Sequence, residues 1–396
     1  MSDDSSPADG ALSSVKILDL TDERAIYGAK LLADLGADVI RLEPPEGDPL
    51  RHRGPYKDDV PGPTNSLYHA FFASNRRFAT VDRRSDDGGR QLNRLVRWAD
   101  VVIDNGSIDP VAVQDYLDKH PQLVIVESSS FGPDGPWRDY LAPDLVASAL
   151  GGICATTGDV DTVPLKGFGE IAFYVSGAYT AIAALTGLHH ARATGPNQGQ
   201  GQRIDVPVHE CLASCLEHVL MWYWYQETLA FASGPHLPRR GGLHWSNAYV
   251  VMPAKDGSIM ITPTPDMEAQ LMWLVEEDVH EDLLDPKYLE PENLILLIGR
   301  MMELLYKWVA TKEVEPFFYQ AQERHSPYGW VLPIEKVGSN PQLAARNWWA
   351  DYTLGDQAAK GPGAPYQFAE TPWRMTPYHG PGHDTAAVLA EIGWED

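Results

Sequence analysis

The chain has 396 residues, of which 44% are hydrophobic and 22% charged, and its formal net charge is −24. This length and apolar content are enough for one or two substantial cores and exclude disorder for most of the chain. The acidic balance excludes nucleic acid as the main partner, because phosphate binding requires clustered Lys and Arg.

Residues 1–14 are acidic and rich in small side chains, without the basic and apolar regions of a signal peptide. No uninterrupted apolar run approaches the ~18 residues of a membrane span. The three cysteines, Cys154, Cys211 and Cys215, lie in apolar sequence, which predicts buried, reduced thiols. These features predict a disordered tail over 1–14 on a cytoplasmic protein that has no membrane partner.

From residue 15 the chain alternates between short apolar runs and amphipathic stretches. The apolar runs predict strands over 15–20, 38–43, 100–104 and 123–127. The amphipathic stretches predict helices over 29–35, 89–99 and 111–120. Buried strands alternating with helices indicate an α/β fold with a mostly parallel, doubly wound, Rossmann-like sheet.

After residue 140 longer helices are expected, over 144–150, 175–193 and 208–230. A hairpin is expected over 249–252 and 258–262, because Lys255-Asp256-Gly257 is a strong turn sequence. The last helix is expected over 385–392. We therefore expect a large α/β domain over 15–230, a smaller α+β domain over 241–330, and a return to the large domain over 331–396.

Several motifs stand in order along the chain. They are Leu18-Asp19-Leu20-Thr21, Asn75-Arg76-Arg77, Phe131-Gly132-Pro133-Asp134-Gly135-Pro136 and Gly380-Pro381-Gly382-His383-Asp384. With these motifs the chain resembles the family III CoA-transferases, the group that includes formyl-CoA and carnitinyl-CoA transferases and the α-methylacyl-CoA racemases. The resemblance runs from Val15 to Gly393.

The resemblance implies ring-shaped subunits in an interlocked dimer, with acyl-CoA and carboxylic acids as substrates. It also implies that coenzyme A binds to the large domain, near a set of residues at matching positions. These residues are Arg41, Asn75, Arg76, Arg77, Asn105, Phe131 and Gly132. The alternative for the arginines is that they pair with the many acidic side chains.

Phe173 is where the chain departs most from this family. The resemblance implies a catalytic aspartate nine residues after Pro164 and four before Gly177, and both counts reach Phe173. In the family an aspartate attacks the thioester to form an acyl anhydride, while backbone N–H groups hold the oxyanions. A phenyl ring cannot do this. Glu170 is the nearest carboxylate, and its alternative is a structural role, because it lies three residues upstream.

Other remodelled residues are candidates for the pocket, each with a non-catalytic alternative. Asp22 and Glu23 replace an Ala-Gly-Pro turn of the family, and His244 follows Arg240-Gly241-Gly242, the remnant of a glycine-rich flap. Asp144 is expected to cap its own helix.

Two further clusters are expected to be structural. The spacing of His209, Cys211, Cys215 and His218 does not place all four on one helix face, so we expect core packing and no metal. The aromatic run 222–225 is expected to form a buried linker helix, or else to line an acyl pocket.

The sequence therefore predicts a protein that acts on CoA thioesters, as one subunit of a hetero-oligomeric transferase. A paralogous partner, in a dimer or tetramer, would supply the missing aspartate. Two alternatives are open: a self-sufficient lyase, isomerase or hydrolase of CoA thioesters that uses Glu170 or His244, and a non-catalytic CoA-binding scaffold.

Overall fold

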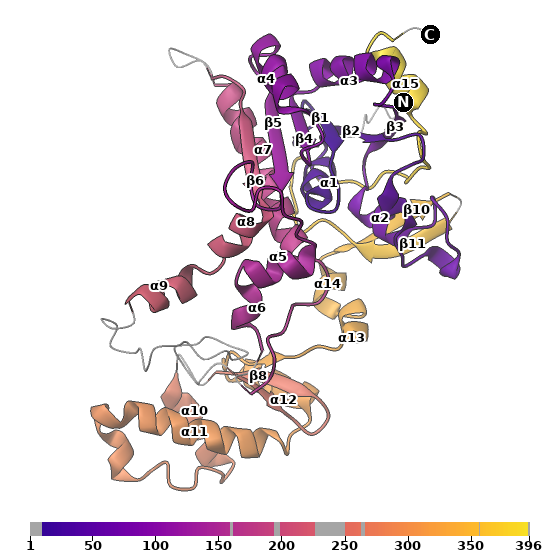
Figure 1. Cartoon of the computed structure of the whole chain (residues 1–396). Helices are drawn as coiled ribbons and strands as arrows, with labels where there is room; N and C mark the ends of the chain where they lie inside the picture. Colours follow the sequence, from indigo (N-terminus) through magenta and orange to yellow (C-terminus); the bar gives the residue numbers. More distant parts are fainter. Residues whose placement is uncertain are drawn as a thin grey trace. The chain divides into compact units, whose positions relative to one another are not determined.

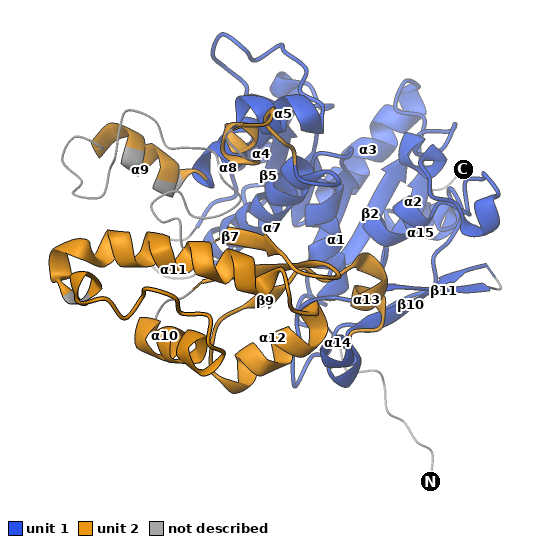
Figure 2. Ribbon diagram, turned by 90° about the horizontal axis from the view of Figure 1, so that it is seen from below, with its two compact units in different colours: residues 1–151, 167–215, 341–396 blue, residues 152–166, 216–340 orange. Residues whose placement is uncertain are grey.

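The protein is described here from a computed structural model, which describes residues 10–158, 161–193, 199–225, 250–262, 266–355 and 357–394. The chain forms two compact units (Figure 2). Unit 1 contains residues 1–151, 167–215 and 341–396, and unit 2 contains residues 152–166 and 216–340. This division differs from the expected boundaries in three places, because 152–166 and 216–225 belong to the smaller unit and the larger one resumes at 341 where 331 was expected.

The error after residue 208 has a local cause. Where one helix was expected, α8 (Val208–Ser214) ends and α9 (Glu217–Tyr225) begins, and neither Gly nor Pro marks the break. Cys215 closes α8 where the chain leaves unit 1, and its side chain is exposed, so the expectation of three buried cysteines was wrong for this residue. Cys154 and Cys211 are buried.

Unit 1 is built on a six-stranded sheet with the order β3-β2-β1-β4-β5-β6 (Figure 1). The strands are β1 (Lys16–Leu20), β2 (Asp38–Glu43), β3 (Arg77–Thr80), β4 (Val101–Asp104), β5 (Val124–Ser129) and β6 (Arg203–Pro207). Every pair of neighbours is parallel, which confirms the predicted α/β fold. The chain winds outward from β1 to β3 and then in the other direction from β4 to β6, so the switch point lies between β1 and β4.

Helices cover both faces of this sheet. Ile17 and Val101 face α1 (Ile26–Asp34) and α7 (Ile171–Ala191). Their neighbours Leu18 and Val102 face the opposite side. That side is covered by α3 (Asp86–Trp98), α4 (Pro110–Lys119) and α15 (Thr385–Glu391). Because successive strand residues point to opposite faces and both faces are covered, β1 and β4 are apolar apart from Lys16, Asp19 and Asp104.

α7 is the one helix among the described residues that is long and apolar enough to cross a membrane. The sequence expectation had found no such stretch. Half of the most apolar 18-residue stretch of α7 is buried within this chain. Ala184 and Leu188 pack into the core on one face of the sheet. Core helices pass the same test of length and composition, and its packing accounts for its apolar character here.

The chain's last segment completes unit 1. The helices α2 (Leu67–Phe72), α5 (Asp144–Leu150) and α14 (Pro341–Ala345) also belong to this unit, as does the hairpin of β10 (Trp349–Leu354) and β11 (Gln357–Pro362). After the hairpin the chain returns to β3: the backbone N–H of Phe78 donates to Asp384 (2.8 Å) and that of Thr80 to the hydroxyl of Thr385 (2.9 Å).

Unit 2 combines a three-stranded antiparallel sheet with helices. The strands are β7 (Val250–Pro253), β8 (Ser258–Ile261) and β9 (Gly329–Trp330), which confirms the predicted hairpin. The helices are α6 (Ile153–Thr156), α9, α10 (Met267–Glu276), α11 (Leu294–Val309), α12 (Val314–Glu323) and α13 (Ile334–Gly338). Trp273, Trp308 and Phe317 form its aromatic core. On α9, Tyr223 and Trp224 are exposed within this chain, unlike the expected buried linker.

Candidate functional site

A cavity of about 380 Å³ opens in unit 1 at the carboxyl ends of its central strands. The loop that follows each of β1, β2, β3 and β4 contributes to its wall, with Glu23, Asp48, Arg83 and Asn105 as respective examples. In open α/β sheets ligands bind at this edge, next to the switch point of the strand order. The position of the cavity therefore marks it as the candidate binding site.

Arg41 lies on β2 beside this cavity, and all its N–H donors are used inside the protein. Nε donates to Asp48 (2.6 Å), and Nη1 donates to Asp19 (2.9 Å) and to the Thr21 hydroxyl (3.1 Å). Nη2 donates to the Thr21 carbonyl oxygen (3.1 Å) and pairs with Asp48. A guanidinium has five N–H donors, so none is left for a ligand while this network stands. The role of Arg41 in contacting CoA stays a prediction.

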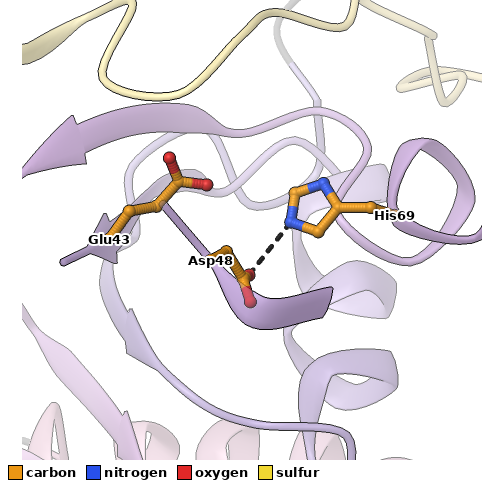
Figure 3. Close-up of side chains that lie close together, drawn as sticks. All are labelled: Glu43, Asp48 and His69. Carbon is orange, nitrogen blue, oxygen red and sulfur yellow. Dashed lines mark hydrogen bonds and ion pairs between the residues drawn. The ribbon is translucent and has the colours of Figure 1, made fainter. Parts of the chain in front are cut away.

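A buried cluster that the sequence analysis did not single out reaches the cavity wall through Glu43 and Asp48. Ligand atoms of Glu43, Asp48 and His69 lie within 4.8 Å of one another, close enough to hold a metal ion. Figure 3 shows the imidazole of His69 pointing at Asp48, and Nε2 lies 3.0 Å from the carboxylate. Two guanidiniums already supply positive charge here, since Arg51 donates to Glu43 (2.7 Å) and Arg41 to Asp48 (2.6 Å).

His69 is uncharged in this cluster. Burial disfavours the charged imidazolium and lowers the pKa of His69 to about 3. This effect outweighs the attraction of the Asp48 carboxylate, which acts in the opposite direction. Its other ring nitrogen, Nδ1, lies 2.8 Å from the hydroxyl of Tyr378, which also accepts from Arg51 (2.7 Å). The C-terminal segment therefore closes this network from the side opposite to Asp48.

Asn75 and Arg76 also use their polar groups internally. Asn75 has a left-handed backbone (φ 58°); its amide nitrogen donates to Asp34 (2.7 Å) and its amide oxygen accepts from the N–H of Thr376 (2.7 Å). Arg76 is buried and pairs with Asp19 at 2.8 Å. Both residues tie β1 and α1 to later parts of unit 1, and neither lines the cavity.

Arg77 begins β3 and binds carboxylates on both sides. It donates to Asp38 through Nε (2.9 Å) and Nη2 (2.8 Å), and to Glu391 through Nη1 (2.6 Å). It therefore joins β2 to the C-terminal helix α15. The ligand role implied for Arg77 by the resemblance stays a prediction.

The cations that the cavity does present are two arginines that the sequence analysis missed. Arg83 and Arg84 line its wall after β3. Arg83 donates to the hydroxyl (2.8 Å) and the carbonyl oxygen (3.2 Å) of Ser107, and Arg84 pairs with Glu46 (2.7 Å) and Asp82 (2.9 Å). Both arginines come shortly after β3, which begins at the last residue of the Asn75-Arg76-Arg77 motif. Ligands bind at the carboxyl ends of parallel strands, so this position could have identified them from the sequence.

Asn105, like Arg41, lines the cavity directly. Its amide nitrogen donates to Asp22 (3.1 Å), and its carbonyl oxygen accepts from Arg24 (3.1 Å). Its side-chain oxygen is buried and has no hydrogen-bond partner among the described residues. Among the described residues, Asn105 therefore keeps one buried acceptor without a partner next to the cavity wall.

Phe131 and Gly132 lie after β5 and outside the cavity lining. The ring of Phe131 packs against Trp137 and His209, with both centroid distances at 5.5 Å. Gly132 has a φ of 91° and donates its N–H to Ser129 (2.9 Å). His209 is thus part of an aromatic cluster, and the side chain of His218 lies outside the described residues.

Phe173 is buried at the start of α7, with 3% of its surface exposed. Glu170 precedes the helix, and both of its oxygens are bound: Oε1 accepts from Arg53 (2.5 Å) and Oε2 from the hydroxyl of Tyr68 (2.7 Å). Burial and the neighbouring Glu170 carboxylate raise the pKa of Tyr68, so its hydroxyl stays protonated and continues to donate. Neither Arg53 nor Tyr68 was singled out from the sequence.

The remodelled loop after β1 packs against the start of α7. Asp22 and Glu23 line the cavity, and the next carbonyl oxygen, of Arg24, accepts from the Ser176 hydroxyl (2.6 Å). One turn further on, Gly28 and Gly177 let α1 and α7 touch backbone to backbone. The loop therefore joins the cavity to the neighbourhood of Phe173. His244 and Arg240-Gly241-Gly242 lie outside the described residues.

Asp144 caps a helix, but not the expected one. Its carboxylate accepts from the backbone N–H of Ala172 (2.8 Å), in the first turn of α7, whereas α5 begins without a side-chain cap. The expectation that Asp144 caps its own helix was wrong, because only the folded chain brings α5 beside α7.

Comparison with known proteins identifies the family of this chain. The sequence model of CoA-transferase family III matches residues 12–385, so the chain belongs to CoA-transferase family III. It is 28% identical to subunit BbsE of the succinyl-CoA:(R)-benzylsuccinate CoA-transferase of Thauera aromatica, over 96% of this chain and 94% of that one. It is also 28% identical to the succinate–glutarate CoA-transferase of Agrobacterium fabrum, over 96% and 95% respectively.

A solved structure shows the same fold. A CaiB/BaiF family protein from Brucella suis matches with a TM-score of 0.80, covering 97% of this chain and 100% of that one at 24% identity. The parallel α/β architecture predicted from the sequence is therefore shared with a known structure.

Proposed function

We propose that this protein is one subunit of a hetero-oligomeric family III CoA-transferase. In this proposal unit 1 binds an acyl-CoA thioester in its cavity, and a paralogous partner subunit supplies the aspartate that forms the acyl anhydride. The observation that carries the proposal is Phe173, which stands where the family resemblance implies the aspartate and is buried as an apolar residue.

Glu170 is poorly suited to replace the missing carboxylate. A nucleophile must have an oxygen free to approach the thioester carbon, at about 3–3.5 Å. Both oxygens of Glu170 are held instead, by Arg53 and Tyr68. This arrangement favours a positioning role for Glu170 and supports a nucleophile from elsewhere.

The cavity suits the nucleotide end of a CoA thioester. It lies at the edge of the sheet where phosphates bind in this fold class, and Arg83 brings positive charge to an otherwise acidic chain. Among the described residues, Arg83 is hydrogen-bonded only to Ser107, a neutral residue, so no hydrogen-bonded carboxylate there neutralises its charge. A phosphate can therefore gain a charge-assisted hydrogen bond there.

Unit 1 also exposes apolar side chains that suit a protein partner. Leu141 is 87% exposed, Phe168 100%, Leu145 61% and Ile182 59%. Such side chains are available to a partner subunit, which would bury them on association. The relative from Thauera aromatica is itself named as a subunit of a CoA-transferase, which supports a multi-subunit assignment.

The test is transfer of CoA between a panel of acyl-CoAs and free acids, followed by mass spectrometry. The wild type, Phe173→Asp and the matched control Phe173→Asn are each purified alone. We expect transfer only by Phe173→Asp, because Asn has a similar size but no nucleophilic carboxylate. If the purified wild type transfers CoA without a partner, the heteromer is refuted. The protein would then be a self-sufficient enzyme, for which Glu170→Gln is the next variant.

The partner is tested separately. Native mass spectrometry after co-expression with a paralogous family III subunit should show a mixed assembly that transfers CoA. A homodimer of this chain that persists beside a separate partner would contradict the proposal.

A further inference from the structure

Arg53 differs from the other arginines that surround the candidate site. Arg41, Arg51 and Arg76 are buried in ion pairs, whereas 38% of the Arg53 side chain is exposed. Its Nη1 donates to Tyr68 (3.0 Å) and its Nη2 to Glu170 (2.5 Å). Within the part of the chain that the structure describes, Nε and the second hydrogens of Nη1 and Nη2 have no acceptor. Arg53 therefore retains donors that a ligand can use.

The guanidinium is also held in place. It lies over the ring of Tyr68, 4.3 Å from the centroid, and the Tyr68 hydroxyl donates to Glu170 (2.7 Å), which closes a ring of three side chains. The backbone is fixed too, because the hydroxyl of Ser66 donates to the carbonyl oxygen of Arg53 (2.6 Å). A guanidinium that is already fixed loses little conformational entropy when it binds an anion.

This group lies where the acyl end of a thioester bound in the cavity is expected. Glu170, its ion-pair partner, stands three residues before Phe173. Glu23 lines the cavity and also lies close enough to Arg53 to help raise its pKa. The loop that carries Glu23 is tied to α7 by the hydrogen bond from Ser176 to Arg24. Glu23 therefore belongs to the cavity wall and also to the surroundings of Arg53.

We propose that Arg53 binds a second, free carboxylate on the acyl group, so that the ligands of this chain are CoA thioesters of dicarboxylic acids. A carboxylate accepts two parallel N–H bonds from a guanidinium, and the free Nε edge of Arg53 matches that geometry. Glu23 and Glu170 flank the guanidinium, so the fixed direction of these N–H bonds, more than net charge, selects the carboxylate. The inference rests on the proposed binding of acyl-CoA to unit 1.

The test compares succinyl-CoA with butyryl-CoA, which have acyl chains of equal length and differ in a terminal carboxylate or methyl group. Binding of both, and of CoA itself, is measured by isothermal titration calorimetry on the full chain. We expect the wild type to bind succinyl-CoA about tenfold more tightly than butyryl-CoA, as one charge-assisted pair provides. Arg53→Gln should lower that ratio to about one and leave the affinity for butyryl-CoA unchanged.

The control is Arg90→Gln, which removes an exposed arginine of α3 that lies outside the cavity wall. It should keep the wild-type preference for succinyl-CoA. A wild type without that preference, or an Arg53→Gln variant that retains it, would overturn the inference while CoA still binds. Failure of all three ligands to bind would instead overturn the proposed function, and this inference with it.

Discussion

The contact between α1 and α7 gives a sharp test of the packing that holds the candidate site. A Cβ atom added to Gly28 would lie 2.4 Å from the carbonyl oxygen of Gly177 and 3.0 Å from Cβ of Thr180. Because the first of these atoms belongs to the backbone, the two helices must separate to accept Gly28→Ala. Overpacking of this kind costs typically about 1–3 kcal/mol, and a rigid backbone neighbour puts this site at the upper end.

The helix propensity of alanine partly offsets that cost. Alanine in place of glycine stabilises a helix interior by about 1 kcal/mol. The overpacking cost is about 3 kcal/mol, and the propensity gain of about 1 kcal/mol is subtracted from it. Gly28→Ala should therefore lower the free energy of unfolding by about 2 kcal/mol. Displacing α1 would also disturb the loop that carries Glu23 and Arg24, so CoA binding should weaken in parallel.

The matched control is Gly89→Ala in α3. A Cβ atom there meets nothing within 4 Å, so only the propensity gain of about 0.5–1 kcal/mol applies. Urea unfolding followed by circular dichroism measures both variants against the wild type. The reasoning is refuted if Gly28→Ala is as stable as the wild type, or if the two variants shift the unfolding midpoint in the same direction.

Three further predictions concern other parts of unit 1. Arg51→Ala leaves the carboxylate of Glu43 buried without its partner and should cost about 3–5 kcal/mol in thermal unfolding, whereas Arg84→Ala, an exposed arginine, should leave the transition unchanged. His69 has a pKa of about 3 in the folded protein against 6.5 in the unfolded chain, so unfolding takes up a proton between these pH values and stability falls as the pH drops below about 6.5. Between pH 6 and 5 the wild type should lose about 1 kcal/mol more than His69→Gln in urea titrations; equal slopes would contradict this. Asp144→Ala removes the cap of α7 and should cost about 1 kcal/mol in the same assay, and a stability equal to the wild type would show that the cap contributes nothing.

The sequence predicted most of the parallel sheet because its central strands are apolar on both faces. Two strands were missed for the same physical reason. β3 (Arg77–Thr80) starts with a charged residue, and β6 (Arg203–Pro207) contains Arg, Asp and Pro within five residues. Short strands at the two ends of a sheet carry polar side chains, and hydrophobic pattern alone does not reveal them.

The candidate site was predicted less completely than the fold. The family resemblance identified Arg41, Asn75 and Arg76, but only the folded chain shows that they pair with internal partners such as Asp19 and Asp34. Such pairings join residues far apart in sequence, so spacing cannot predict them.

The residues with spare donors were missed for the opposite reason. Arg53 and Arg83 follow secondary-structure elements in loops and belong to none of the motifs that identified the family. Their importance depends on which side chains near the site are left unsatisfied, and that is a property of the folded chain alone.

The closure of unit 1 by its C-terminal segment has a consequence for synthesis. Tyr378 accepts from Arg51 across 327 positions of sequence, and Asp384 and Thr385 bind the edge strand β3. These partners leave the ribosome last, after all of unit 2 has been translated. The nascent chain therefore carries a sheet whose edge strand β3 still lacks its C-terminal partners, while the smaller unit, whose residues from 216 to 340 are continuous, is free to fold first. Truncation by a premature stop codon near residue 370 would leave a cell with the complete smaller unit and a larger one whose buried Arg51 and Glu43 were never enclosed.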